Sequence, residues 1–321
     1  MVEKYLSLIE AEIRKQKFGH QPKSLYEPIR YIMNLGGKRL RPLLSALSYS
    51  LYHRDVEKII PYAVAVEAFH NFTLLHDDIM DKAPLRRGKK TVHEKWSINT
   101  AILSGDVMLV KVYEMFTRLD EGKFKEVLKI FNRCAAQVCE GQQWDMEFEN
   151  EKKISEARYL EMIRLKTAVL LGFSLELGAL LADASDLDRK ALRDFGINIG
   201  MGFQLKDDWL DVYADKMKFG KQVGGDIVAN KKTFLLIKAL ENAKGGNKEA
   251  LEKWIARRKF DKTKKIEAIT SIYDGLNISA LTERKINYFF KKGFTCLDGL
   301  STPQNTDHLI GFVQKLIHRE T

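Results

Sequence analysis

The sequence predicts an all-α protein that forms a single helical domain over residues 1–321, and three observations support this. Apolar residues recur at spacings of three and four along almost the whole chain, which is the period of a helix with one buried face. No convincing alternation of apolar and polar residues marks a strand. Only 6 Pro and 21 Gly interrupt the 321 residues, so long helices are possible, and 45% hydrophobic residues can fill a large core.

Gly, Pro and capping residues set the expected helix boundaries. Gly36-Gly37 ends one helix, and Pro42 fits the first turn of the next, where its missing N–H is tolerated. The expected helices are Met1–Gln16, Leu25–Leu35, Arg41–Tyr52, Glu57–Asp81, Ala101–Leu119, Phe124–Glu147, a helix to Leu181 with Ser155 as N-cap, Asp188–Tyr213 and Thr233–Ala243. We expect basic, Gly-containing loops at Leu85–Thr91 and Asp215–Gly225.

Composition narrows the classes of function. Lys and Arg total 53 against 43 Asp and Glu, a net charge of +10, which fits either a basic surface or an anionic ligand. No zinc-finger, helix-turn-helix or aromatic RNA-binding pattern is present, so we expect no nucleic-acid partner. The three Cys residues show no metal spacing and indicate reduced thiols. The N-terminus lacks the apolar core of a signal peptide, and Glu176 interrupts the most apolar stretch, so we expect a cytoplasmic protein without stable membrane insertion.

Two Asp-rich turns carry the functional prediction. Residues 77–81 and 207–211 both have the pattern DDxxD, each preceded by apolar sequence. Because a helix turns about 100° per residue, the first and last Asp of each motif lie one above the other, where their carboxylates repel. One such motif alone is compatible with a solvated helix face. Two of them favour a site for Mg²⁺, which takes carboxylate oxygens and completes its shell with water and phosphate oxygens, so that opposed clusters would hold a diphosphate between them.

Cations near both motifs would complete such a site, since a diphosphate needs donors as well as metals. Lys38, Arg39 and Arg41 stand at a helix start, where free backbone N–H groups also favour anions. Lys166 stands in a long apolar helix, where an unpaired Lys is unfavourable. Further candidates follow the two Asp motifs, namely Arg86, Arg87, Lys221 and Lys231, although each of these residue types is more often a solvated surface group.

Taken together, these motifs resemble those of the trans-isoprenyl diphosphate synthases, or polyprenyl synthetases. The resemblance spans Leu25 to Ala243 and leaves the C-terminal stretch without a recognised motif. It rests on GGKRLRP (Gly36–Pro42), LLHDDIMD (Leu74–Asp81), RRG (Arg86–Gly88), SGD (Ser104–Asp106), EGQ (Glu140–Gln142), KTA (Lys166–Ala168), FQLKDDWLD (Phe203–Asp211), GGD (Gly224–Asp226) and NKKT (Asn230–Thr233).

The resemblance implies a large helical bundle around a deep central cavity, usually as a homodimer. It implies two metal-binding motifs that share about three Mg²⁺ ions, Asp77, Asp78 and Asp81 in the first and Asp207, Asp208 and Asp211 in the second. The implied ligands of the allylic diphosphate are Arg86, Lys166, Lys221 and Lys231. Those of isopentenyl diphosphate are Lys38, Arg41, His70 and Arg87. Thr167 and Gln204 would line the reacting carbon chain.

The implied reaction is a Mg²⁺-dependent, head-to-tail condensation. Metal ions and cations stabilise the diphosphate as the allylic C–O bond breaks, and the double bond of isopentenyl diphosphate attacks the carbocation. The family places its chain-length residues just before the first motif, here at Phe72 and Thr73. One aromatic residue there, with no insertion in the motif, favours a C20 (geranylgeranyl) product, with C15 (farnesyl) and longer products as alternatives.

Other classes of function remain open at this point. A terpene cyclase would share the fold and the first Asp motif, but its second metal motif normally has an Asn/Ser/Glu pattern that residues 207–211 do not match. A regulatory subunit of a heteromeric synthase often lacks one Asp motif, and both are intact here. A basic nucleic-acid-binding module is the remaining alternative, distinguished from the enzyme by retention on DNA without turnover.

Overall fold

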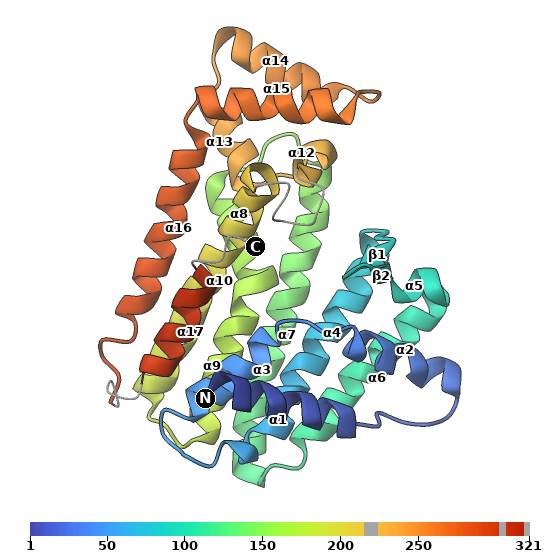
Figure 1. Ribbon diagram of the computed structural model, residues 1–321, viewed down its shortest axis with the longest axis vertical. Helices are drawn as coiled ribbons and strands as arrows, with labels where there is room; N and C mark the ends of the chain where they lie inside the picture. Colours follow the sequence, from blue (N-terminus) through green and yellow to red (C-terminus); the bar gives the residue numbers. More distant parts are fainter. Residues whose placement is uncertain (215–223, 302–305, 318–321) are drawn as a thin grey trace. The chain divides into compact units, whose positions relative to one another are not determined.

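The computed structural model describes residues 1–214, 224–301 and 306–317, and almost all of its regular structure is helical (Figure 1). This confirms the predicted all-α class. The elements up to residue 150 are α1 (Val2–Lys15), α2 (Lys23–Asn34), α3 (Leu40–Tyr49), η1 (Val56–Lys58), α4 (Ile60–Met80), β1 (Leu85–Arg86), β2 (Lys89–Lys90), α5 (Val92–Lys95), α6 (Ile98–Phe116) and α7 (Glu121–Asn150).

The later elements include the predicted helix to Leu181 and the predicted helices Asp188–Tyr213 and Thr233–Ala243, with bounds that differ by at most two residues, together with helices for which no bounds were predicted. They are α8 (Glu156–Ile163), the π-helical turn η2 (Arg164–Ala168), α9 (Val169–Leu181), α10 (Asp186–Tyr213), α12 (Gly225–Ala229), α13 (Phe234–Asn242), α14 (Gly245–Ala256), α15 (Lys262–Gly275), α16 (Ile278–Thr295) and α17 (Asp307–Ile317). The predicted cap Ser155 is confirmed, because its side chain accepts a hydrogen bond from the first turn of α8. Thr233 caps α13 in the same way.

The chain forms two compact units, each built from segments that are separate in the sequence. The first unit consists of Met1–Arg133, Phe173–Arg193 and Gly299–Phe312. The second unit consists of Cys134–Gly172, Asp194–Asp298 and Val313–Thr321. The prediction of a single domain over the whole chain stays a prediction.

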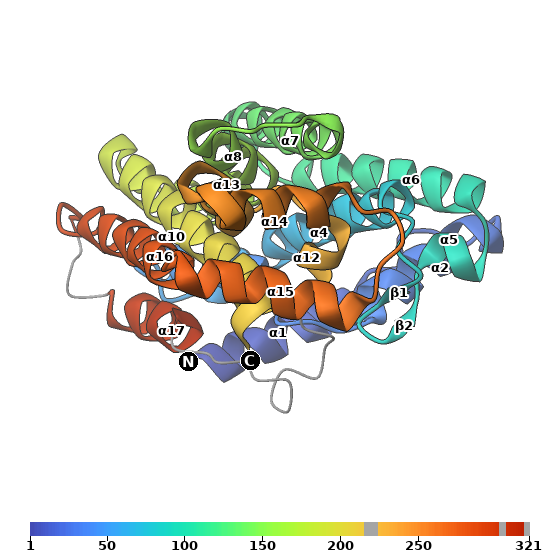
Figure 2. The same cartoon turned by 90° about the horizontal axis from the view of Figure 1, so that it is seen from above.

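The core of the first unit is aromatic and lies where α4 packs along α6 (Figures 1 and 2). Phe131 is fully buried there, and three other phenylalanine rings lie with their centroids 5.0 to 5.7 Å from its own, namely Phe69, Phe116 and Phe173. Such edge-to-face and tilted contacts add to the free energy gained by burying the rings. The long helix α4, which carries the first Asp motif at its C-terminal end, is thereby fixed in place.

The second unit buries a separate aliphatic core. Residues of the C-terminal end of α10 and of α12 to α16 contribute to it, including Val212, Ile227, Leu235, Leu251 and Ile278. Helices α14 and α15 lie side by side over α13 (Figure 1). Because the second Asp motif lies on α10 next to Val212, burial of this face holds the motif against α12.

Two sequence predictions are corrected by the structure. The segment Leu85–Thr91 is a short antiparallel hairpin rather than an irregular loop, since Arg87 and Gly88 take the positive φ angles of 51° and 72° that a tight two-residue turn requires. The predicted helix to Leu181 is interrupted by the π-helical turn η2, which contains Lys166 and Thr167. The predicted loop Asp215–Gly225 lies outside the described residues up to position 223.

Among the described residues, no helix combines the length and the apolar character needed to cross a bilayer.

Candidate active site

The first Asp motif ends α4 and separates its carboxylates by environment. Asp78 is buried, with 2% of its surface exposed, whereas Asp77 is half-buried and Asp81 is exposed. Arg86 forms a forked ion pair with Asp78: its Nε lies 2.9 and 2.8 Å from the two carboxylate oxygens, and its Nη2 lies 2.7 Å from Oδ1. This charge-assisted pairing compensates the buried charge of Asp78. Asp77 and Asp81 are the members of the motif that face outward.

The hairpin that carries Arg86 is tied to the elements around it. Thr91 donates a hydrogen bond from Oγ1 to the carbonyl oxygen of Ala83 over 2.7 Å. Tyr31 on α2 donates from its hydroxyl to the carbonyl oxygen of Lys90 over 2.7 Å. Both bonds hold the open end of the hairpin, so Arg86 is held opposite Asp78 by backbone as well as by its own side chain.

A group of arginines surrounds His70 in the same unit. Burial, followed by the positive charges of nearby arginines, holds the pKa of His70 well below its ordinary value; in decreasing order these are Arg41, Arg87, Arg86 and Arg39. The imidazole is therefore neutral at neutral pH and its positively charged neighbours remain available to an anion. The structure thus brings together three of the four residues predicted to hold isopentenyl diphosphate.

The turn before α3 explains why Gly is needed next to Arg87. A Cβ atom on Gly37 would lie 2.8 Å from three atoms of the Arg87 guanidinium group, and Gly37 has a φ of +140° that other residues rarely adopt. The turn and the guanidinium group are therefore in direct contact. Lys38 follows Gly37 immediately and is exposed, so the same turn carries it.

Arg39 has a structural role that the sequence analysis did not assign to it. It adopts the left-handed conformation and is 3% exposed, with Nε 2.7 Å from Glu10 and Nη1 2.9 Å from the buried carboxylate of Glu67. Its Nη2 also donates to the carbonyl oxygen of Met33 over 2.8 Å. One of the three cations at this helix start therefore points into the first unit and anchors the turn.

In the second unit, the second Asp motif also has a buried middle carboxylate and more exposed outer carboxylates. Asp208 is buried, Asp207 is exposed and Asp211 is half-buried. The hydroxyl of Tyr159 donates to Oδ2 of Asp208, and Gln204 donates from Nε2 to Oδ1 over 3.0 Å. The middle carboxylate is again occupied by protein groups, although here by neutral donors rather than an arginine.

Thr167 and Gln204 are joined by this network. The Thr167 hydroxyl donates to Oε1 of Gln204 over 3.1 Å, so a chain of hydrogen bonds runs from Thr167 through Gln204 to Asp208. Lys166 is bonded to Asp145 on α7, with 2.6 Å between Nζ and Oδ2. A small cavity of about 60 Å³ is lined by these groups, including Lys166, Thr167, Gln204, Asp208 and Lys231.

Two glycines allow the π-helical turn to lie where it does. A Cβ on Gly141 would meet the backbone nitrogen of Lys166 at 2.2 Å, and a Cβ on Gly200 would meet the Cα of Ala168 at 2.7 Å. Both contacts are with backbone, which cannot move aside as a flexible side chain can. Gly141, the middle residue of the EGQ motif, therefore permits the close approach of α7 to the turn that bears Lys166 and Thr167.

Asp211 is joined to the start of α12. Its Oδ2 accepts a hydrogen bond from the backbone N–H of Asp226 over 2.9 Å. Lys231 lies one turn later, and its backbone N–H donates to the carbonyl oxygen of Asp226. The buried Lys265 holds this segment from behind, with Nζ 2.7 Å from Oδ1 of Asn230.

Acid groups gather around this part of the second unit and change one another's ionisation. Burial raises the pKa of Asp208 to about 6, an effect opposed mainly by the positive charge of Lys231. Burial also raises the pKa of Asp226 to about 7, with the charges of Asp208 and Asp211 adding to the increase. A nearby cation would reverse these shifts, so the cluster favours binding of positive charge.

Comparison with known proteins assigns this arrangement to a family. The family model for polyprenyl synthetases matches residues 22–273, which is most of the chain. The chain belongs to the polyprenyl synthetase family. A short chain isoprenyl diphosphate synthase of Methanocaldococcus jannaschii is 45% identical over 228 residues, covering 71% of this chain and 69% of that protein. A geranylgeranyl pyrophosphate synthase of Geoglobus acetivorans is 43% identical over 237 residues, covering 73% and 74%.

A solved structure extends the similarity to the whole fold. A crystal structure of a geranylgeranyl pyrophosphate synthase matches with a TM-score of 0.94 at 40% identity, and the match covers 100% of this chain and 99% of that one. This polyprenyl synthetase is therefore a prenyltransferase, and the predicted family and type of enzyme are confirmed. Isoprenyl diphosphate synthases use divalent metal ions.

The carboxylates of this polyprenyl synthetase suit a metal that the substrate helps to bind. Among the described residues, no three His, Cys, Asp or Glu side chains converge as a preformed metal cluster. Magnesium commonly binds to one or two carboxylates and takes its other ligands from water and phosphate oxygens. The outward-facing Asp77, Asp81, Asp207 and Asp211 supply such donors.

The sequence analysis missed several residues that hold the site of this polyprenyl synthetase. Asp145, Tyr159 and Asp226 were not chosen as site residues, although Asp226 belongs to the quoted GGD motif. Nothing in the local sequence distinguishes Asp145 or Tyr159 from an ordinary helical residue, because their partners lie more than twenty residues away in the chain. Lys221 lies outside the described residues, so its predicted role stays a prediction.

The close contact at Gly141 predicts a selective effect of adding one methyl group. Gly141→Ala forces the π-helical turn away from α7, because the new Cβ would overlap backbone, and we expect it to destabilise the protein by about 1–3 kcal/mol and to lower prenyltransferase turnover. Gly122→Ala in the first turn of the same helix is the control, since its nearest contact would be the Asp120 carboxylate at 3.5 Å. Urea unfolding and steady-state kinetics measure both effects; equal behaviour of the two variants would contradict this role of Gly141.

The raised pKa of Asp226 predicts how the stability of the metal-free protein depends on pH. An acid whose pKa is higher in the folded state binds more protons when folded, so stability falls as pH rises from about 4 through about 7. We expect Asp226→Asn to reduce this fall, while the exposed Asp298→Asn leaves it unchanged. Urea unfolding between pH 5 and pH 8 measures the free energy of unfolding of each protein as a function of pH. A parallel fall in all three proteins would show that Asp226 is not responsible.

Proposed function

We propose that the enzyme condenses isopentenyl diphosphate head to tail with allylic diphosphates in a Mg²⁺-dependent reaction and that its main product is geranylgeranyl diphosphate. The observation that carries this proposal is the division within both Asp motifs. In each motif the middle carboxylate is buried and bonded to other side chains, while the first and last carboxylates are exposed or half-buried. The C20 product is supported by the name of the Geoglobus relative and by the geranylgeranyl pyrophosphate synthase that shares the fold.

Metal binding is proposed for the six Asp residues in unequal roles. Asp77, Asp81, Asp207 and Asp211 would bind about three Mg²⁺ ions together with diphosphate oxygens. Asp78 and Asp208 were also predicted as ligands, and their bonds to Arg86 and Tyr159 give them a supporting position in the absence of metal. Bound Mg²⁺ would neutralise charge on the diphosphate.

The cations would bind the two diphosphates separately. Arg41, His70 and Arg87 lie close enough for the arginine charges to depress the pKa of His70, and with Lys38 they would hold isopentenyl diphosphate. Arg86, Lys166, Lys231 and the undescribed Lys221 would hold the allylic diphosphate. A neutral His70 suits this role because its ring N–H can donate to a phosphate without adding to the crowding of positive charges.

The chemical step needs no side-chain nucleophile. The allylic C–O bond breaks and its electron pair leaves with the diphosphate, which the surrounding cations stabilise. The double bond of isopentenyl diphosphate then forms the new C–C bond, and loss of a proton to the departing diphosphate restores a double bond. Thr167 and Gln204, already joined by a hydrogen bond, would line the reacting end of the chain.

Chain length is proposed to depend on Phe72 and Thr73. Phe72 is half-buried, and its ring centroid lies 4.8 Å from that of His76 in an edge-to-face contact. Thr73 donates from Oγ1 to the carbonyl oxygen of His70 over 2.8 Å, which turns its hydroxyl back onto the helix. A large ring next to a small side chain, one turn before Asp77, is suited to limiting the space open to a growing hydrocarbon.

A homodimer is proposed from the exposed apolar residues of α6. Four large side chains of this helix are 40% to 61% exposed, namely Ile98, Ile102, Leu103 and Val110. Apolar residues grouped along one helix commonly mark a protein interface, and a second copy of the chain would cover them. The cytoplasmic location expected from the composition stays a prediction.

The proposed reaction predicts that removing one carboxylate from either Asp motif strongly lowers turnover. With Mg²⁺, isopentenyl diphosphate and an allylic starter, we expect diphosphate release that a chelator stops. Asp77→Ala and Asp207→Ala should each lower turnover by roughly a hundredfold to a thousandfold, a loss typical of one group that stabilises transition-state charge. The control is Asp298→Asn, which changes an exposed carboxylate outside both motifs. Turnover that persists in the Asp variants or with chelator would refute the proposal.

The proposed role of Phe72 predicts a change in product length. We expect Phe72→Ala and Phe72→Ser to lengthen the main product beyond C20, because removing the ring opens space ahead of the growing chain. Phe124→Ala, another half-buried phenylalanine of the first unit, is the control and should leave the product unchanged. Mass spectrometry of the extracted products measures the length and also distinguishes C20 from the C15 alternative. An unchanged product from the Phe72 variants would show that this ring does not limit the chain.

A further inference from the structure

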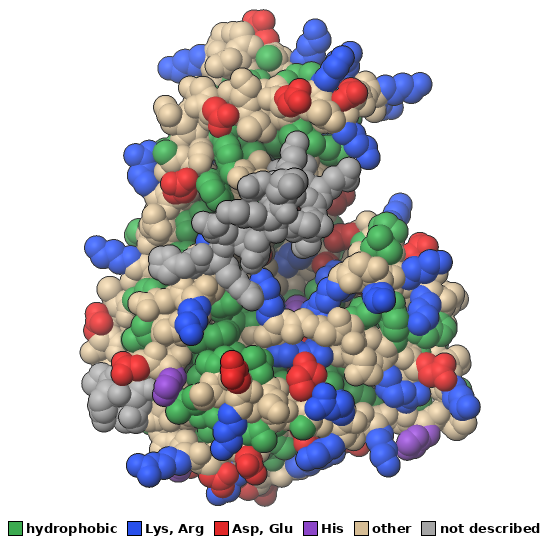
Figure 3. Space-filling model, in the orientation of Figure 1, with side chains coloured by type: hydrophobic (Ala, Val, Ile, Leu, Met, Phe, Trp, Pro, Cys, Tyr) green, Lys and Arg blue, Asp and Glu red, His purple; other side chains and the backbone are tan. Residues whose placement is uncertain are grey.

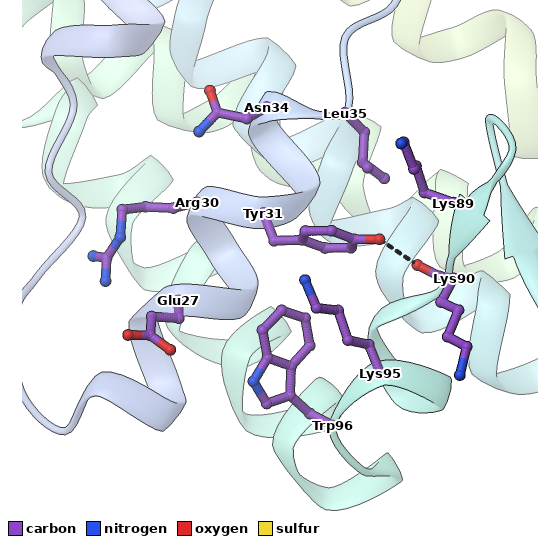
Figure 4. A pocket seen from close by; sticks show the side chains of 9 residues that line it. All are labelled: Glu27, Arg30, Tyr31, Asn34, Leu35, Lys89, Lys90, Lys95 and Trp96. Carbon is purple, nitrogen blue, oxygen red and sulfur yellow. Dashed lines mark hydrogen bonds between the residues drawn. The ribbon is translucent and has the colours of Figure 1, made fainter.

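A cationic groove in the first unit is not used by the proposed reaction. It has a volume of about 780 Å³, within the range of small-molecule pockets, and it lies between α2, the hairpin and α5 (Figure 4). Its lining residues are Glu27, Arg30, Tyr31, Asn34, Leu35, Lys89, Lys90, Lys95 and Trp96. Four of these lining residues are cations and one is an acid. In Figure 3, Lys and Arg side chains gather over the part of the surface where Figure 1 draws the hairpin and α5.

Aromatic rings hold one of these cations in place. The Nζ of Lys95 lies 3.9 Å from the centroid of the Tyr31 ring and 4.6 Å from that of Trp96. The two rings meet edge to face with their centroids 5.3 Å apart. Cation–π contacts restrict the ammonium group without neutralising its charge, so Lys95 remains able to bind an anion.

The other cations of the groove also keep their charge available. Within the described residues, no carboxylate forms an ion pair with Arg30, Lys89, Lys90 or Lys95. The Arg30 guanidinium donates to the carbonyl oxygen of Gly19 over 3.0 Å, a bond that leaves its positive charge uncompensated. Figure 4 shows the amines of Lys89 and Lys95 on either side of the Tyr31 ring.

The walls of the groove combine this charge with apolar surface. Tyr31, Leu35 and Trp96 supply rings and an aliphatic side chain between the cations. Inorganic phosphate would meet only the charges and leave most of the groove unfilled. A phosphate or diphosphate ester with an apolar or aromatic body would use both parts of the wall.

We propose that this groove is a second anion-binding site, which takes an organic phosphate with an apolar or aromatic body. The groove is fixed without ligand, because the hydrogen bond from Tyr31 to the carbonyl oxygen of Lys90 joins its two walls. Binding there requires no turnover. The proposal is therefore tested independently of the proposed function.

The test is calorimetric titration of the full-length protein with phenyl phosphate and, separately, with inorganic phosphate. We expect phenyl phosphate to bind more tightly than phosphate and its affinity to fall as salt is added. Lys95→Gln and Lys89→Gln should each weaken phenyl phosphate binding by roughly tenfold, the loss expected for one charge-assisted contact. Lys4→Gln, which changes an exposed lysine of α1, is the matched control. Prenyltransferase turnover of each variant reports whether it is folded.

Two further results decide the proposal. If Lys95→Gln fails to fold because its ring contacts are lost, Lys89→Gln, on the exposed hairpin, still provides the test. Co-sedimentation with phosphatidylglycerol vesicles that is lost in the lysine variants would identify a lipid headgroup as the source of the phosphate, whereas phenyl phosphate binding without co-sedimentation identifies a free ligand. Phenyl phosphate affinity that is equal in wild type, Lys89→Gln and Lys95→Gln would overturn the proposal.

Discussion

The organisation of this protein depends on how it accommodates ionised carboxylates beside an apolar interior. An ionised group that is removed from water requires a partner, and removing one partner of such a pair is strongly destabilising. The protein meets this requirement in the same way at both Asp motifs, by bonding the buried middle carboxylate to other side chains. Asp78 is bonded to Arg86, and Asp208 is bonded to Tyr159 and Gln204. These bonds fix the middle carboxylate of each motif, while the outer carboxylates are exposed or half-buried.

The partners of Asp78 and Asp208 differ in charge, and this difference affects how each site interacts with a cation. Arg86 balances Asp78 with a full positive charge, whereas Tyr159 and Gln204 are neutral donors. Burial raises the pKa of Asp208 to about 6 and that of Asp226 to about 7, and neighbouring carboxylates add to both increases. Ionisation of these two groups at neutral pH therefore reduces the stability of the metal-free protein, and a divalent cation bound nearby would offset this cost.

Backbone contacts at glycine place the functional residues as much as side-chain bonds do. Gly141 admits the π-helical turn that carries Lys166, and Gly37 admits the guanidinium group of Arg87. Gly105 has a comparable role, because a Cβ there would lie 2.3 Å from Nε2 of His76 on α4. Each glycine belongs to a short motif that also contains a charged residue, namely GGKRLRP, EGQ or SGD. Of the three, only Gly141 meets backbone, so there the small residue decides whether the neighbouring element can approach.

Apolar periodicity, together with Gly, Pro and capping residues, was enough to predict the long helices up to residue 243, because apolar spacing and capping act within one or two turns. The short helices α5 and α12 were not predicted. Sequence patterns also identified the Asp motifs, whose i and i+4 spacing has a direct physical meaning. The hairpin at residues 85–90 was missed because its strands are too short to alternate. Tyr159 and Asp145 were missed because only tertiary packing brings them to Asp208 and Lys166. The burial of Arg39 was also invisible, since it depends on Glu10 and Glu67 from other helices.

The outer carboxylates of both motifs are proposed to bind divalent metal together with a diphosphate. The most direct measurement is a crystal structure with Mn²⁺ and methylene diphosphonate, using anomalous scattering to locate the ions. We predict Mn²⁺ ligated by Asp77 and Asp81 and by Asp207 and Asp211, with diphosphonate oxygens completing the coordination. Ions found only elsewhere, or none at either motif in the presence of diphosphonate, would contradict it.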